Sequence, residues 1–288
     1  RDWSSDVCSS DLWGQLLTTG VFHYVMGGNI SSVLVNYANI PMVVAPYLNS
    51  QYPGQSISGA IGHATRVFAG SGRKAEVEMI GANGKKVTMD VMPSVANYAP
   101  DSKYGKQYAT LVRVLNDHGQ LDRSQLYEMI RGDTSTGTLD KINAVSGWAF
   151  HHGERMNREI TMMATYDLEN RKLAAQVRAG KMTAEEAEEA AAYKAIQTVE
   201  LTNGSLASAA SPRISHNIIG NMAYMFKRYA STHYYMLLKA FNQATDKLLS
   251  PAERKMARKQ LAGIYGMAGL MAGVQGLPLF GVLAMVWN

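Results

Sequence analysis

The sequence predicts a mainly α-helical fold: an elongated multi-helix assembly with one small β-hairpin insertion at about residues 75–92. Along most of the chain, apolar residues recur at steps of three and four, the spacing of helices that bury one face. One stretch instead alternates apolar and polar residues around a Gly-Ala-Asn-Gly turn at residues 81–84, which is typical of a hairpin. The apolar content of 47% and the mean hydropathy of -0.14 indicate a sizeable core and argue against a protein of many membrane spans.

The first twelve residues (RDWSSDVCSSDL) show no apolar period and no helix cap, and they resemble a translated sequencing adapter. We therefore treat residues 1–12 as an artefact and leave them out of the fold. They contain Cys8, the only cysteine, so we expect the remaining chain to form no disulfide and to offer no thiol nucleophile or cysteine metal ligand. We also expect that the native N-terminus is missing and that the chain is a fragment of a larger protein.

Before the hairpin, the sequence predicts short helices separated by glycine and proline. Helices are expected over residues 13–26, 30–39 and 56–69. A short apolar helix over residues 42–52 is expected to be interrupted, because Pro41 precedes it and Pro46 lies within it. The small side chains of the helix over residues 56–69 indicate close packing against a neighbour.

After the hairpin, the predicted helices become longer. They are expected over residues 102–117, 122–130 and 139–179, and from a capping box at Thr183 and Glu186 to about residue 201. A Gly/Ser/Ala-rich linker follows at residues 203–212. The predicted organisation is therefore a helical domain with the hairpin (residues 13–202), the linker, and a basic helical segment with an apolar C-terminal end (residues 213–288).

The last segment carries two predicted helices and an uncharged end. A stripe from Met222 to Ala240 recurs with helical spacing. A second helix is expected to begin after Ser250, with that residue as N-cap, Pro251 at the first helical position and Glu253 in the first turn. Residues 261–288 then contain no Asp, Glu, Lys or Arg.

Positive charge is concentrated in this segment. Nine basic residues face only Asp246 and Glu253, whereas the whole chain has a net charge of +5. This asymmetry predicts an anionic partner, either DNA or acidic lipid. The candidate binding residues are Arg213, Lys227, Arg228, Lys239, Lys247, Arg254, Lys255, Arg258 and Lys259.

The apolar end admits two interpretations. As one helix its 28 residues would span about 42 Å, enough for a bilayer, although Gln275, Gly276 and Pro278 indicate a break into shorter pieces. It is then either a buried helical hairpin or a membrane-contacting segment. Gly269 and Gly273 form a GxxxG spacing that permits close helix packing in both cases. The candidate membrane-contacting residues are Leu270, Met271, Val274, Leu277, Leu279 and Phe280.

The densest polar cluster on a predicted helix is WAFHHGERMNREI, at residues 148–160. His151 and His152 with Glu154 and Glu159 have spacings that metal sites use, but opposite-charge pairs four residues apart explain the same pattern. There is no GxSxG motif and no phosphate-binding glycine loop between a strand and a helix. We therefore predict no catalytic residue, no metal site and no cofactor.

Several consecutive blocks of the chain resemble a known family. These blocks are GNISSVLVNYANIPMVVAPYL, WAFHHGERMNREITMMATYDL, ISHNIIGNMAYMFKRYASTHYYMLLKAF and SPAERKMARKQLAGIYGMAGLMAGVQGLPLFGVL. They resemble, in the same order, the helical C-terminal region of internal virion or DNA-ejection proteins of short-tailed phages, a group of large polyvalent proteins. The segment from Pro278 to Gly281 is a shortened form of the PLxRFG motif of some relatives.

The resemblance implies a non-enzymatic virion protein. It would lie in the capsid interior and then enter the host cell envelope to assist genome ejection. The implied partners are phage DNA, other virion proteins, the host inner membrane and further copies of the same chain, and the implied full-length protein can carry a peptidoglycan-cleaving domain upstream. The alternative function is a helical nucleic-acid-binding or membrane-associated protein outside the virion, and a third possibility is an enzyme fragment that uses the histidines of the polar cluster.

Overall fold

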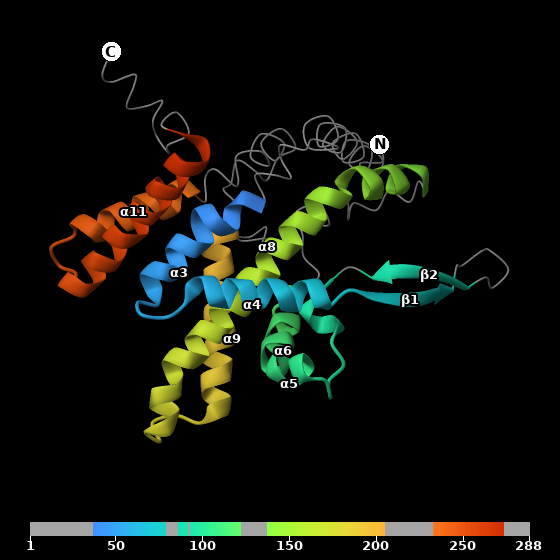
Figure 1. Cartoon of the computed structure of the whole chain (residues 1–288), viewed down its shortest axis with the longest axis horizontal. Coiled ribbons are helices and arrows are strands. Elements are labelled where there is room, and N and C mark those ends of the chain that lie inside the picture. The colour runs from blue at the N-terminus through green and yellow to red at the C-terminus, as the bar shows by residue number, and fades with distance from the viewer. Residues whose placement is uncertain (1–36, 79–85, 92, 122–136, 205–232, 274–288) are drawn as a thin grey trace, which may run out of the picture. The chain divides into compact units, whose positions relative to one another are not determined.

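A computed structural model describes residues 37–78, 86–91, 93–121, 137–204 and 233–273 of the chain. These residues are mainly helical (Figure 1), which confirms the predicted class. Two predicted helices lie entirely outside the described residues, those over residues 13–26 and 122–130. Most of the predicted helix over residues 30–39 and most of the linker also lie outside them. The elements are η1 (Ile40–Val44), α3 (Ala45–Gln51), α4 (Ile57–Gly70), β1 (Arg73–Glu78), β2 (Lys86–Val91), η2 (Val95–Asn97), α5 (Lys103–Gln107), α6 (Ala109–Asp117), α8 (Gly137–Arg178), α9 (Ala184–Asn203), a helix over residues 233–245 and α11 (Pro251–Ala272).

The interruption expected at Pro41 and Pro46 is wrong. Residues 37–51 are helical throughout, and Pro41 lies in the π-helical turn η1. A π turn changes the hydrogen-bond spacing, so it can accommodate a residue that has no N–H to donate. Pro46 is the second residue of α3, which directly follows this turn.

Most other helix boundaries follow the predicted caps and stops. Ser56 accepts a hydrogen bond from Gly59 at the start of α4, and Thr183 and Glu186 form the predicted capping box before α9. Gly180, with a φ of 68°, follows the end of α8. The helix expected over residues 102–117 is instead divided into α5 and α6, because Tyr108 between them has a non-helical backbone conformation (φ -109°, ψ 13°).

The strands β1 and β2 form a two-stranded antiparallel sheet. Arg73 pairs with Val91 at one end of the ladder and Glu78 with Lys86 at the other. The chain then passes through Ser94, whose side chain caps η2 by accepting a hydrogen bond from the Ala96 N–H.

The chain divides into two compact units that do not follow sequence order. Unit 1 comprises Arg1–Pro53, Arg123–Asn157 and Val199–Asn288, and unit 2 comprises Gly54–Asp122 and Arg158–Thr198. The boundaries between the units fall inside α8 and inside α9, so both of these helices contribute residues to each unit. This grouping does not test the predicted division at residues 203–212, which stays a prediction.

In unit 1, α11 packs against η1 and α3. The buried residues Val43, Met236, Leu237 and Ile264 form a hydrophobic cluster, and the partly buried residues packed against it are Met42, Leu201, Leu261 and Tyr265. The helix over residues 233–245 buries Met236, Leu237, Ala240 and Ala244, so it turns the last part of the predicted stripe toward this core. The part of the stripe before residue 233 lies outside the described residues.

α11 begins with the predicted N-cap and first turn. Ser250 and Glu253 form a capping box, with Pro251 in the first turn. The hydrogen bonds that Ser250 donates to the Glu253 carboxylate lower the pKa of that carboxyl. The same helix continues through the basic residues into the apolar stretch and ends at Ala272, because Gly273 adopts a φ of 67° as the C-cap. The end of the helix therefore comes before the break expected at residues 275–278.

The packing of α11 on α3 depends on a glycine, and this gives a matched test. A Cβ atom on Gly263 would lie 2.8 Å from the Cβ of Pro46, whereas a Cβ on Gly266, one turn further along α11, would meet nothing within 4 Å. We predict that Gly263→Ala lowers the free energy of unfolding by about 1–3 kcal/mol through overpacking. Gly266→Ala should raise it by about 0.4–1 kcal/mol, because alanine is the better helix former. Chemical denaturation followed by circular dichroism measures both, and equal effects of the two substitutions would contradict the close approach.

Candidate functional site

Six of the nine predicted anion-binding residues lie in the described part of unit 1. Five of them are exposed and Arg254 is half-buried, and the exposed set is Lys239, Lys247, Lys255, Arg258 and Lys259. None of the six makes an ion pair with a carboxylate within the described residues. The remaining predicted residues, Arg213, Lys227 and Arg228, lie outside them.

Two of these cations also hold neighbouring helices. The Lys259 ammonium donates to the backbone carbonyl of Asn49 at 2.9 Å and to its side-chain carbonyl at 3.2 Å. The Arg258 Nε donates to the carbonyl of Ala244 at 3.3 Å. Neutral carbonyl groups position these side chains without cancelling their charge, so the positive potential at the start of α11 is retained.

The two acidic residues of this region accept hydrogen bonds from backbone N–H groups. Asp246 accepts from the Leu248 N–H at 2.8 Å, and Glu253 accepts from the Ser250 N–H at 2.9 Å. These carboxylates therefore stabilise a turn and a helix start rather than pairing with the cations around them.

Of the predicted membrane-contacting residues, the structure describes Leu270 and Met271. Leu270 is 82% exposed and Met271 is 50% exposed, near the C-terminal end of α11. The residues Val274, Leu277, Leu279 and Phe280 lie outside the described residues. No helix in the described part of the chain is both long enough and apolar enough to cross a membrane.

Unit 1 has a second exposed apolar set, which was not predicted from the sequence. It lies on the helix over residues 233–245 and just after it, and it comprises Tyr234, Tyr235, Leu238, Phe241 and Leu248. Lys239 and Lys247 are exposed among these residues. The exposed face of this helix therefore carries large apolar side chains beside a cation, and such a face is a candidate contact surface.

The polar cluster at residues 148–160 contributes structural contacts. The buried carboxylate of Glu159 accepts from the Val95 N–H at 2.7 Å, and the buried Arg158 donates to the side chain of Gln120 at 2.8 Å. Within the residues that the structure describes, no group of three or more His, Cys, Asp or Glu side chains could hold a metal ion.

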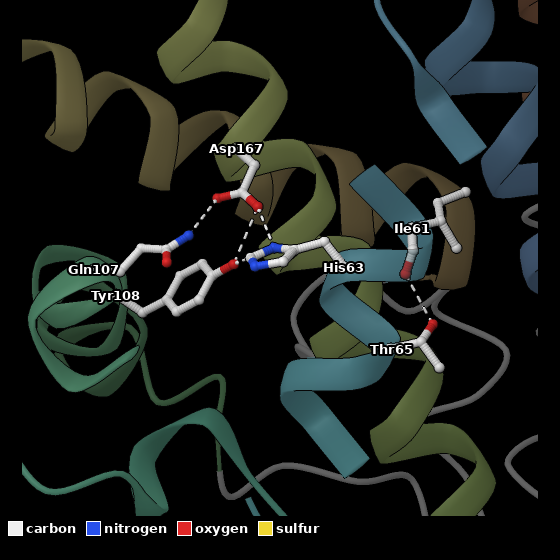
Figure 2. Close-up of polar contacts among 6 residues, drawn as sticks. All are labelled: Ile61, His63, Thr65, Gln107, Tyr108 and Asp167. Carbon is white, nitrogen blue, oxygen red and sulfur yellow. Dashed lines mark hydrogen bonds and ion pairs between the residues drawn. The ribbon is translucent and has the colours of Figure 1, made fainter. Parts of the chain in front are cut away.

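Unit 2 contains a polar cluster that the sequence analysis did not find. Figure 2 shows Asp167 of α8 facing His63 of α4 and Gln107 and Tyr108 at the end of α5. One carboxylate oxygen lies 3.1 Å from Nδ1 of His63 and accepts from the Tyr108 hydroxyl at 3.0 Å. The other oxygen accepts from the Gln107 amide at 3.3 Å.

The hydrogen bonds assign the proton on His63. Its Nδ1 lies within reach of Asp167 and, at 3.4 Å, of the Tyr108 hydroxyl oxygen. The hydroxyl proton of Tyr108 is already donated to the carboxylate, so both neighbours of Nδ1 act as acceptors and Nδ1 carries the hydrogen. Burial raises the pKa of Tyr108 well above its usual range, and the negative charge of Asp167 adds to this effect, so Tyr108 remains a neutral donor.

A cavity of about 700 Å³ adjoins this cluster. Asp167 and His63 line it, together with further residues of α5, α8 and α9, among them Lys106, Tyr166, Asn170, Arg171, Arg178 and Glu188. This volume lies within the range of about 300–1,000 Å³ that is typical of small-molecule sites. The cavity is therefore large enough to hold a small molecule.

Tyr166 is the least satisfied polar residue of the cavity wall. It is 2% exposed, and its hydroxyl makes no hydrogen bond within the described residues. Burial raises its pKa to about 12 and the charge of Glu188 contributes, while hydrogen-bonding groups of Asn170 and Thr110 reduce this rise. A buried hydroxyl without a partner costs free energy, so it needs an explanation.

The two cavity tyrosines give a paired prediction. Tyr108→Phe removes a hydrogen bond to a buried carboxylate and should lower the free energy of unfolding by about 1.5–3 kcal/mol. Tyr166→Phe removes a hydroxyl that has no partner and should change it by less than about 0.5 kcal/mol, or stabilise the protein. Urea denaturation of the two variants decides between these outcomes, and an equal loss in both would show that the Tyr166 hydroxyl is hydrogen-bonded.

Comparison with protein-family models, with curated proteins and with solved structures finds no match for this chain. The two candidate sites therefore rest on the contacts described above: the basic residues of unit 1 and the cavity beside Asp167 in unit 2.

Proposed function

We propose that this chain is part of a non-enzymatic phage virion protein, an internal virion protein that assists genome ejection and binds duplex DNA through the basic residues of unit 1. The observation that supports DNA binding is the set of exposed cations on α11 and the helix over residues 233–245, which have no carboxylate partners in the described part of the chain. The resemblance of the sequence blocks to DNA-ejection proteins supports the virion role.

In this proposal the chain is one stretch of an elongated multi-helix assembly, with the hairpin of β1 and β2 as an insertion. It lies in the capsid interior with phage DNA, other virion proteins and further copies of itself, and later reaches the host envelope. No cofactor takes part. Peptides of this chain should accordingly be found by mass spectrometry in purified phage particles, and genes for portal, tail and terminase proteins should lie near its gene.

The DNA-binding part has a quantitative test. Because the cations lie on helix surfaces and no base-reading motif is present, we predict duplex binding without sequence preference. If four or five phosphates are neutralised, the slope of log affinity against log salt concentration should be about -4. The variant in which Lys255, Arg258 and Lys259 are changed to Gln should bind more weakly with a shallower slope, as measured by fluorescence anisotropy.

A matched control separates local charge from net charge. The exposed cations Arg66, Lys103 and Lys181 belong to unit 2, and their replacement by Gln removes the same total charge. This control should bind DNA nearly as well as the unchanged chain. Equal weakening in both triple variants, or a flat response to salt, would contradict a specific interface in unit 1.

A second candidate function is association with an anionic membrane surface. The observation that favours it is the combination of exposed apolar residues (Leu238, Phe241, Leu270) with exposed cations on the same helices. Cations near an anionic leaflet contribute about 1 kcal/mol each, and buried apolar side chains add to this.

Vesicle flotation tests this candidate. We predict that the chain floats with vesicles containing anionic lipid and that Leu270→Asp combined with Met271→Asp reduces the floating fraction severalfold, because both side chains are exposed and free to insert. The matched control is Gln243→Asp combined with Thr245→Asp, since these exposed polar residues offer little apolar area. If the unchanged chain stays in solution with every vesicle composition, the membrane candidate is wrong.

A further inference from the structure

The carboxylates around the cavity of unit 2 have hydrogen-bond donors, whereas its lysine and arginine side chains have no carboxylate partner within the described residues. Its two carboxylates already accept hydrogen bonds: Asp167 from three side chains, and Glu188 from the Thr110 hydroxyl at 2.6 Å. Its three cations are Lys106, Arg171 and Arg178, and none of them makes an ion pair within the described residues. These hydrogen bonds come from neutral donors, so both carboxylates keep their charge, and the cavity wall carries three cations against two carboxylates, a net charge of +1.

The arrangement of these cations follows from their elements. Arg171 and Arg178 are seven residues apart on α8, which is two helical turns, so they lie on the same face of that helix. Lys106 comes from α5, a different element that also lines the cavity. Two guanidinium groups and one ammonium group around a single concave site favour an anion with several oxygen atoms, because guanidinium groups bind phosphate and carboxylate oxygens in pairs.

Two further features describe the ligand. The hydroxyl of Tyr166, a residue of the cavity wall, is buried and makes no hydrogen bond of standard geometry within the described residues. The wall also includes the apolar residues Ala174, Val177, Ala184 and Ala187. A ligand that matches both features carries charged oxygens on a small organic body.

We propose that this cavity binds a small organic phosphate, a phosphate monoester, with Lys106, Arg171 and Arg178 as its charge partners and the Tyr166 hydroxyl as an additional donor. A phosphate monoester is preferred to a carboxylate because its three terminal oxygens can accept hydrogen bonds from all three cationic side chains at once. His63 lies beside the site with its Nδ1 hydrogen directed to Asp167 and Tyr108, so it remains a further cavity-lining group.

Isothermal titration calorimetry of the full 288-residue chain tests this proposal with four probes. Adenosine 5′-monophosphate should bind saturably with a Kd in the micromolar to millimolar range, about 10⁻⁶ to 10⁻³ M. Adenosine, which lacks the phosphate, should bind at least about tenfold more weakly. Inorganic phosphate reports the recognition of the charged group alone, and succinate reports a dicarboxylate of similar charge.

Variants then place the binding in the cavity. Arg171→Gln combined with Arg178→Gln should weaken the monophosphate at least about tenfold, because each arginine contributes charge-assisted hydrogen bonds. The control that combines Arg66→Gln with Lys103→Gln removes the same charge from exposed residues of unit 2 that do not line the cavity, and it should bind normally. Tyr166→Phe should weaken binding severalfold while the melting temperature stays unchanged.

The outcomes are distinguishable from those of the DNA experiment. The variant with Lys255, Arg258 and Lys259 changed to Gln should retain monophosphate binding, because those residues belong to unit 1. Saturable binding of the monophosphate or of inorganic phosphate that is lost only in the Arg171 and Arg178 variant supports the proposal. Equal binding of adenosine, tighter binding of succinate, equal weakening by the charge-matched control, or no saturable binding of either phosphate probe would overturn it.

Discussion

A buried carboxylate that must be compensated is the constraint on which unit 2 is built. Asp167 is 8% exposed, and an ion in that position is costly unless donors surround it. The donors come from α4 and from the junction of α5 and α6, so one side chain on α8 fixes the positions of three other helices. The non-helical backbone of Tyr108 belongs to the same arrangement, since the residue that separates α5 from α6 also donates its hydroxyl to Asp167.

The sequence predicts those helix ends that depend on interactions between residues close together in the chain. Ser250 with Glu253, Thr183 with Glu186, and Gly180 act on backbone groups within a few residues, so their pattern alone locates the helix ends. The Asp167 cluster could not be found in this way. His63 lies 104 positions from Asp167 and Tyr108 lies 59 positions from it, and no local spacing relates them. The only indication was weak: an aspartate at a position of α8 that the helical period assigns to the buried face.

The lysine and arginine side chains differ in how much they contribute to the stability of the fold. Arg113 and Glu189 form an exposed ion pair at 2.6 Å, and such pairs contribute at most about 1 kcal/mol to stability. Lys255 on α11 and Arg171 on α8 have no such partner within the described residues, so they add little to folding and slightly increase the repulsion between like charges. Under the proposals made above, their contribution is to association with an anion: in unit 1 along the surface of a helix, and in unit 2 around a concave site of limited volume.

The same distinction separates structural from functional polar groups in unit 2. The buried carboxylate of Glu159 has a hydrogen-bond partner, as a well-packed interior requires. The Tyr166 hydroxyl is one of several buried side-chain atoms of the described residues that depart from that rule, and it belongs to the cavity wall that also carries Lys106, Arg171 and Arg178. A phenylalanine there would keep the ring packing and avoid the cost of the unsatisfied hydroxyl, so folding alone does not account for a tyrosine. A buried polar group without a hydrogen-bond partner is expected at a binding site, because the ligand then supplies the missing partner.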